Sequence, residues 1–101
     1  RTDRLAEATE LLEKALSLSP DDAFILDSMG WLHYRKGNLE RAREYLERAW
    51  TQRQDPEIAA HLGEVLWVKG SRDEAAKLWD ATLRSHPGNE ALLETLKRFK
   101  R

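Results

Sequence analysis

The three histidines are the residues best suited to bind a metal ion, but their spacing does not predict a metal site. His33, His61 and His86 have no second histidine or cysteine four residues away, so they lack the helical pair that binds zinc. The sequence contains no cysteine, which excludes disulfides and thiolate metal sites. We predict no metal site, and we expect a half-buried His33, a groove-lining His61 and a loop position for His86.

The other reactive residue types form no catalytic motif. No serine or histidine lies in a nucleophile motif, and no glycine-rich loop is present to cradle a phosphate. Carboxylates are abundant, but pairs such as Arg43 and Glu47 are typical of a solvated helix face, where they contribute a few tenths of a kcal/mol. The sequence therefore predicts a protein that is not an enzyme, with no catalytic residue and no cofactor.

The charge balance argues against two classes of partner. The 101 residues include 17 basic and 18 acidic ones, which gives a formal net charge of −1 and no attraction for nucleic acid or an anionic membrane. A basic tail suits the negative end of a helix dipole but lacks the interleaved aromatic residues that stack on bases. The tail consists of Lys97, Arg98, Lys100 and Arg101. We expect no nucleic-acid binding and no direct membrane contact.

Two further features concern targeting. No run approaches the roughly 18 apolar residues that a membrane span needs, and no signal peptide is visible. The sequence begins with Arg1 rather than Met. We interpret this start as a cut through a longer protein, whose targeting signal would lie upstream.

Two stretches of the sequence match each other at an offset of 33 residues. The matched pairs are Met29 with Leu62, Gly30 with Gly63, Gly37 with Gly70, Ala42 with Ala75 and Leu46 with Trp79. An earlier half copy matches at an offset of 34, with Ala8, Leu12 and Ala15 mapping to Ala42, Leu46 and Ala49. A last half copy begins near Glu90. Such a period indicates stacked supersecondary units.

Within each copy, apolar residues recur at helical spacing between residues that start or end helices. Gly37 and Gly70 suit left-handed C-caps, Ser71 with Glu74 forms a capping box, and Asp55 precedes a proline in the first helical turn. The remaining helices are expected to begin at Asp21 or Asp22, at Asn38 and at Asn89. The pattern predicts an all-α protein with helices over residues 3–18, 22–36, 39–53, 56–69, 72–85 and 89–100.

Two glycines fall inside predicted helices, where glycine costs about 1 kcal/mol relative to alanine. Gly30 and Gly63 recur at the repeat offset, so their presence is not accidental. The facing helices carry Ala42 and Ala75 at matched positions. We predict that each glycine marks a close approach between two paired helices.

The alternation of large and small residues resembles that of the tetratricopeptide repeat over nearly the whole chain. The resemblance rests on Leu26, Met29, Gly30, Gly37, Ala42, Leu46 and Ala49, and on Ala59, Leu62, Gly63, Gly70, Ala75, Trp79 and Pro87. It implies a solenoid of antiparallel helix pairs that binds other polypeptides. The implied division is a half repeat over 1–21, full repeats over 22–55 and 56–89, and a C-terminal capping helix over 90–101.

In such solenoids the first helix of each pair lines a concave face. The resemblance therefore places these residues in a partner-binding groove: Phe24, Asp27, Trp31, Tyr34, Arg35, Glu57, His61, Glu64 and Trp67. Some members of the family clamp a carboxyl terminus with lysine, asparagine and arginine. The corresponding positions here hold Asp27, Ser28, Trp31, Glu57 and His61, so we predict no such clamp.

The tryptophans divide between core and groove. Trp79 matches Leu46, and we expect it in the core. Trp31 and Trp67 lie off the core stripe, where large aromatic residues are typical binding anchors. Two interpretations remain for them: they contact a partner, or they pack on neighbouring helices or on a repeat outside this sequence. For Trp67 we favour the partner.

A narrower resemblance links two segments, residues 30–50 and 55–79, to the C-terminal repeats of large Gram-negative outer-membrane lipoproteins of this repeat family. It implies a periplasmic location and an adaptor role for a C-terminal processing protease; without it, a cytoplasmic location is expected. The alternative to a binding scaffold is a purely structural end of a longer solenoid, whose binding surface lies in other repeats.

The two ends of the array give opposite expectations. Helix 3–18 lacks the first helix of its repeat, so its apolar residues predict self-association. At the other end Lys97 replaces the glycine of the earlier copies, and basic residues follow it. We expect that end to be finished by a polar outer face, with no further helix packing closely on it.

Overall fold

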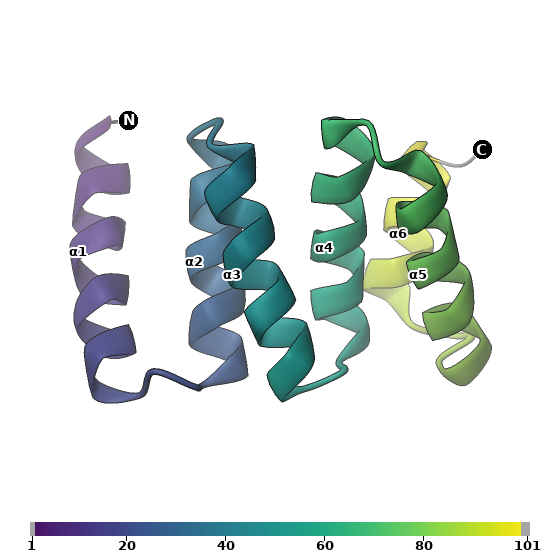
Figure 1. Cartoon of the computed structure of the whole chain (residues 1–101), viewed down its shortest axis with the longest axis horizontal. Helices are drawn as coiled ribbons and strands as arrows, with labels where there is room; N and C mark the ends of the chain where they lie inside the picture. Colours follow the sequence, from purple (N-terminus) through teal and green to yellow (C-terminus); the bar gives the residue numbers. More distant parts are fainter. Residues whose placement is uncertain (1, 100–101) are drawn as a thin grey trace. The chain divides into compact units, whose positions relative to one another are not determined.

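The computed structural model describes residues 2–99, which form six α-helices and no strand (Figure 1). The helices are α1 (Thr2–Leu18), α2 (Ala23–Arg35), α3 (Leu39–Gln52), α4 (Pro56–Lys69), α5 (Arg72–Ser85) and α6 (Glu90–Phe99). The predicted all-α fold is confirmed, and every predicted helix is present. Lys100 and Arg101 of the predicted basic tail lie outside the described residues.

Short polar side chains start four of the helices. The side chains of Asp22, Asn38, Asp55 and Asn89 each accept a hydrogen bond from a backbone N–H two or three residues further on. These bonds satisfy N–H groups that have no partner within the helix. Pro56 occupies the first turn of α4, where its missing N–H leaves no bond unmade.

The predicted capping box at α5 is wrong. Ser71 occupies the N-cap position, but its side chain makes no capping hydrogen bond. The Ser71 backbone N–H, which a capping box would pair with the Glu74 side chain, donates to the carbonyl oxygen of Leu66 at 2.8 Å.

Glycines follow the C-terminal ends of α2 and α4, as predicted. Gly37 has a φ of 86° and Gly70 a φ of 104°, in the left-handed region that other residues rarely enter. The N–H of Gly70 donates to the carbonyls of Leu66 and Trp67 at the end of α4. The turn that follows each glycine brings the chain into the next helix.

The chain divides into two compact units, residues 1–53 with α1 to α3 and residues 54–101 with α4 to α6. In the first unit, α2 packs against α3 and against α1. Its core comes from α2 and α3 and consists of Ala23, Leu26, Met29, Leu32, Ala42, Leu46 and Ala49, none more than 8% exposed.

In the second unit, α4 packs against α5 and α6. Its core consists of Ile58, Ala59, Ala60, Leu62, Val65, Leu66, Ala75, Trp79 and Leu92. Trp79 is the largest of these side chains and has no exposed surface, so its predicted core position is confirmed. A buried aromatic of this size dominates the apolar area of a small unit.

The two helical glycines mark close contacts with the facing helix, but the contact includes that helix's backbone only at Gly30. A Cβ atom at Gly30 would lie 2.6 Å from Leu46 Cγ and 3.1 Å from the carbonyl oxygen of Ala42. A Cβ atom at Gly63 would fall on the indole of Trp79, against Nε1 and Cε2. Each glycine therefore receives the largest buried side chain of the facing helix, Leu46 of α3 or Trp79 of α5.

Candidate partner-binding surface

One side of α2 carries five of the residues assigned to the groove. Phe24, Asp27, Trp31, Tyr34 and Arg35 follow one another at steps of one to four residues, and all are at least partly exposed. The core residues of α2 occupy the other side of the helix. Because residues three and four apart share a helix face, the five side chains form one continuous surface, which we call the α2 stripe.

Aromatic rings make up most of the α2 stripe. The ring centroids of Trp31 and Tyr34 are 4.7 Å apart, with a tilt of 33° between the ring planes. Phe24 is 50% exposed, and the guanidinium carbon of Arg53 lies 5.3 Å from its ring centroid. Arg53 was not assigned to the site from sequence, because it lies after α3 and outside the repeat positions considered. The α2 stripe presents rigid apolar area next to charged groups, a composition typical of binding hot spots.

The corresponding residues of α4 are more enclosed. Glu57 is exposed and His61 is partly exposed. Glu64 is only 6% exposed, and its Oε1 atom accepts a hydrogen bond from Arg98 Nη2 of α6 at 3.0 Å. The sequence offered a signal for this ion pair, since positions 64 and 98 are 34 residues apart and occupy the same place in successive first helices. Glu64 thus contributes to the attachment of α6 to α4.

Trp67 belongs to an aromatic cluster within the second unit. Its ring centroid lies 5.6 Å from that of Trp79 and 6.1 Å from that of Phe99. The guanidinium carbon of Arg72 lies 5.1 Å from the Trp67 ring centroid, within cation–π range. Trp67 keeps part of its surface exposed. It therefore packs on neighbouring helices, and contact with a partner through its exposed part stays a proposal.

His33 lies outside the α2 stripe and packs against α3. Its ring stacks on Tyr45 with centroids 5.4 Å apart and an interplanar angle of 11°, and its Nδ1 atom is buried without a hydrogen-bond partner. Burial, together with the positive charges of Lys36 and Arg41, lowers the pKa of His33 below 6.5, while Glu13 of α1 opposes the shift. The guanidinium carbons of Arg41 and Arg48 lie 5.7 and 5.6 Å from the centroid of the Tyr45 ring. The cluster joins α2 to α3.

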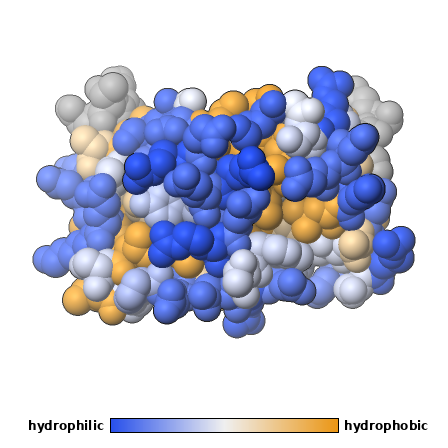
Figure 2. Space-filling view, viewed as in Figure 1, coloured by the Kyte–Doolittle hydropathy of each residue, from blue (hydrophilic) through white to orange (hydrophobic). Residues whose placement is uncertain are grey.

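Two further properties of the described residues bear on other functions. Among residues 2–99, no three histidine, aspartate or glutamate side chains gather where they could hold a metal ion. None of the helices in that part of the chain is long and apolar enough to cross a membrane. On the face shown in Figure 2, hydrophilic side chains cover α3, and hydrophobic ones reach the surface between α4 and α5 and near the C-terminal end of α1.

The arrangement of paired helices with a glycine at each crossing defines the class of this protein. The model of the tetratricopeptide repeat family matches residues 2–62 and again residues 33–98. The chain therefore belongs to the tetratricopeptide repeat family. Proteins of this family generally act as non-catalytic scaffolds for protein–protein interaction.

Individual relatives share this repeat. A TPR repeat-containing protein of Pseudomonas aeruginosa is 56% identical over 64 residues, which is 63% of this chain and 11% of the relative. A TPR repeat-containing protein of Methanocaldococcus jannaschii is 27% identical over 77 residues, 76% of this chain and 14% of the relative. This chain thus spans only about a tenth to a seventh of these curated relatives.

A solved structure shows the same fold. The crystal structure of a thermophilic TPR protein from Thermus thermophilus superposes on 95% of this chain with a TM-score of 0.85 and 24% sequence identity. The match covers 50% of that protein. At this level of identity the likeness concerns the arrangement of the helices and not the residues of a binding surface.

Proposed function

We propose that this chain is a protein-interaction scaffold that binds a partner polypeptide along the α2 stripe. The observation that carries this proposal is the exposure of aromatic side chains on α2. Phe24, Trp31 and Tyr34 add nothing to the core of their unit, and half of the Phe24 side chain is exposed. Clustered, partly exposed aromatic residues are favoured as anchors because they offer large area at a small loss of conformational entropy.

The repeat division belongs to the same proposal. Residues 1–21 would form the second half of a repeat, 22–55 and 56–89 two full repeats, and 90–101 a C-terminal helix. The other predicted groove residues belong to the second unit, where they stay a proposal of their own: Glu57, His61, Glu64 and Trp67. In the second unit, however, Glu64 and Trp67 also hold α6. That observation favours a structural role for this half, as the end of a longer solenoid.

Crosslinking from the α2 stripe tests the proposal. A photoreactive amino acid at position 34 should crosslink to one protein in the native cell, whereas the same group at position 45, on α3, should not. With that protein purified, Trp31→Ala should weaken binding by about 2 kcal/mol or more and leave the helical circular dichroism intact. Unchanged affinity for both Trp31→Ala and Phe24→Ala would exclude the stripe as the binding surface.

The sequence resemblance to outer-membrane lipoproteins supports a more specific proposal. The partner would be a periplasmic C-terminal processing protease, and the chain would act as part of its adaptor on the periplasmic side of the outer membrane. The test is the rate at which such a protease cleaves a substrate with and without this chain. If the chain neither changes the cleavage rate nor co-sediments with the protease, the protease is excluded as its partner. The scaffold proposal would then apply to other partners.

Self-association through α1 is the third proposal. Leu11 is 69% exposed and Leu18 is 77% exposed, and Ala8, Leu12 and Ala15 are only half buried. Their counterparts in α3, Ala42, Leu46 and Ala49, have no exposed surface. Sedimentation over a hundredfold range of concentration should show association that Leu11→Glu abolishes. A strictly monomeric chain would contradict it.

A further inference from the structure

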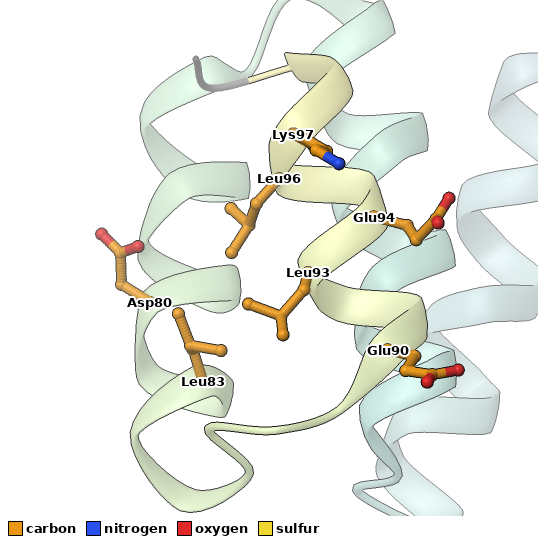
Figure 3. Close-up of a pocket in the computed structure, with 7 residues that line it drawn as sticks. All are labelled: Asp80, Leu83, Glu90, Leu93, Glu94, Leu96 and Lys97. Atoms are coloured by element: carbon orange, nitrogen blue, oxygen red, sulfur yellow. The ribbon is translucent and has the colours of Figure 1, made fainter.

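A groove of about 760 Å³ lies between α5 and α6, outside the surfaces described so far. Leu83 of α5 and Leu93 and Leu96 of α6 point toward the space between the two helices (Figure 3). Leu93 is 43% exposed. The outer face of α6 is therefore not finished by polar residues, and the expectation of a completed C-terminal end is wrong for the described part of this helix.

The repeat explains why this groove has the shape of a helix-binding site. Leu93 and Leu96 stand 34 residues after Ala59 and Leu62 of α4, which are 0 and 4% exposed. The matching residues of α2, Leu26 and Met29, are 0 and 1% exposed. α4 and α2 are each paired with a following helix, α5 and α3 respectively. Leu93 and Leu96 thus occupy positions that a helix covers elsewhere in this chain.

The charges around the leucines specify the surface of the occupant. Asp80 lies on the α5 side of the groove, and Glu90 and Glu94 lie on the α6 side with Lys97 (Figure 3). Three carboxylates against one ammonium give the rim a net charge of −2. Opposite charges on a partner steer its approach and fix its register, whereas like charges are repelled. The occupant should carry basic residues on both flanks of an aliphatic ridge.

The chain's own α1 does not meet this requirement. Its exposed surface offers Leu11 for the apolar ridge, but the charged residues around it are mainly acidic. They are Glu7, Glu10, Glu13 and Lys14. An acidic helix in an acidic groove is disfavoured. The α1 helix of a second copy of this chain is therefore a poor occupant.

We propose that the α5/α6 groove is a docking site for an amphipathic helix of a partner protein, with a ridge of leucine-like residues and lysine or arginine on both flanks. The site is separate from the α2 stripe and belongs to the second unit alone. Leu83, Leu93 and Leu96 receive the ridge, and Asp80, Glu90 and Glu94 select for the basic flanks. Helix-in-groove recognition of this kind reads residues one turn apart.

The test uses two synthetic helical peptides that differ only in charge. Both carry leucines at positions i, i+3, i+4 and i+7; one has lysines on both flanks and its twin has glutamates. Fluorescence anisotropy with the full chain should show binding of the lysine peptide, weakened by added salt. The glutamate peptide should bind at least about tenfold more weakly. Equal affinity of the two peptides would overturn the proposal.

Variants of the groove locate the binding. Leu93→Asp should weaken binding of the lysine peptide by about tenfold or more, because it places a charge in the apolar seam. The matched control is Leu18→Asp, a more exposed leucine at the end of α1, which should bind the peptide as the wild type does. The double variant Glu90→Gln, Glu94→Gln leaves the leucines in place. It should reduce the preference for the lysine peptide over the glutamate peptide.

Two results contradict the proposal at this stage. One is an affinity that none of the groove variants changes while circular dichroism shows them folded. The other is wild-type chain that sediments as an oligomer and becomes monomeric on Leu93→Asp, which would assign the groove to a second copy. If Leu93→Asp loses both peptide binding and helicity, the variant Glu90→Gln, Glu94→Gln decides, because it keeps the leucines and their packing. An unchanged preference for the lysine peptide in that variant would then contradict the proposal.

Discussion

The two units of this protein contain equivalent first helices that have different surroundings. In the first unit α2 packs against α1 and α3, and its residues Trp31 and Tyr34 contact each other. In the second unit α4 packs against α6, which is itself a first helix. There Glu64 pairs with Arg98 and Trp67 packs near Phe99. The same repeat position thus pairs two aromatic rings of one helix in the first unit and attaches α6 to α4 in the second.

This difference follows from which helix types each unit contains. In the first unit α2 packs against α1 and α3, and in the second unit α4 packs against α5 and α6. Repeats in a solenoid contact only their neighbours, and within the second unit α6 covers the α4 positions that Glu64 and Trp67 occupy. A repeat motif therefore specifies where a residue points, and the neighbouring repeat determines what the residue does.

The largest expected effect on stability comes from Leu46 and Trp79, the side chains that pack against Gly30 and Gly63. Trp79→Ala should lower the free energy of unfolding by about 3–5 kcal/mol, because it removes a fully buried aromatic side chain. Leu46→Ala, at the matched position of the first unit, should cost about 2–5 kcal/mol. Urea titration followed by circular dichroism measures both. A stable Trp79→Ala variant alongside an unfolded Trp67→Ala variant would reverse our division between core and groove.

Adding side chains at the glycines sharpens the comparison. Gly63→Leu and Gly30→Leu should each destabilise the chain by at least about 1–3 kcal/mol through overpacking. Gly63→Ala should be worse tolerated than Gly30→Ala, because its Cβ meets the rigid indole of Trp79, while Leu46 can rotate. Gly88→Ala is the control, since its Cβ would meet nothing within 4 Å. Unchanged thermal midpoints for both leucine variants would mean that the paired helices do not meet there.

Breaking the ion pair between α4 and α6 should have a smaller effect. Arg98→Met leaves the carboxylate of Glu64, whose side chain is 7% exposed, without this charged partner. The expected loss is about 1–2 kcal/mol, less than for a fully buried pair because the Arg98 side chain is 55% exposed. Arg84→Met on α5 should change stability by less than about 0.5 kcal/mol. Equal urea midpoints for the two variants would show that the pair contributes nothing.

The smallest expected effect is on pH dependence and concerns the first unit. The pKa of His33 lies below 6.5 in the folded state, so the unfolded chain binds the proton more readily. Its contribution to stability is therefore present above pH 6.5 and is lost as the pH falls through the lowered pKa. His33→Gln should flatten the fall in thermal midpoint across this window.

Most of the fold could be predicted from sequence because its determinants are local. Gly37, Gly70 and the side chains that cap α2, α3, α4 and α6 mark the helix ends, and the recurrence of Gly30 at Gly63 marks the crossings. The failure at Ser71 is equally local, since the backbone N–H that a capping box needs is bonded to the carbonyl of Leu66. Residue type predicts that a capping residue is available but not which hydrogen bonds its backbone and side chain make.

The candidate site was less predictable. The α2 stripe follows from helical spacing, but the pairing of Glu64 with Arg98 depends on how α6 packs on α4. The exposed surface of Leu93 depends on the absence of a covering helix from the described structure. Neither property belongs to a residue by itself. Sequence could place these side chains on a face, and only the packed helices show which faces are covered.

The stacked indoles of Trp67 and Trp79 give the second unit an optical signature of its own. Two indole rings with centroids 5.6 Å apart and planes 25° from parallel couple their ultraviolet transitions. Circular dichroism in the aromatic bands should therefore carry a paired signal that disappears when α4 and α5 separate. Because Trp31 of the first unit is tilted against a tyrosine instead, this signal would report melting of the second half of the chain without any attached label.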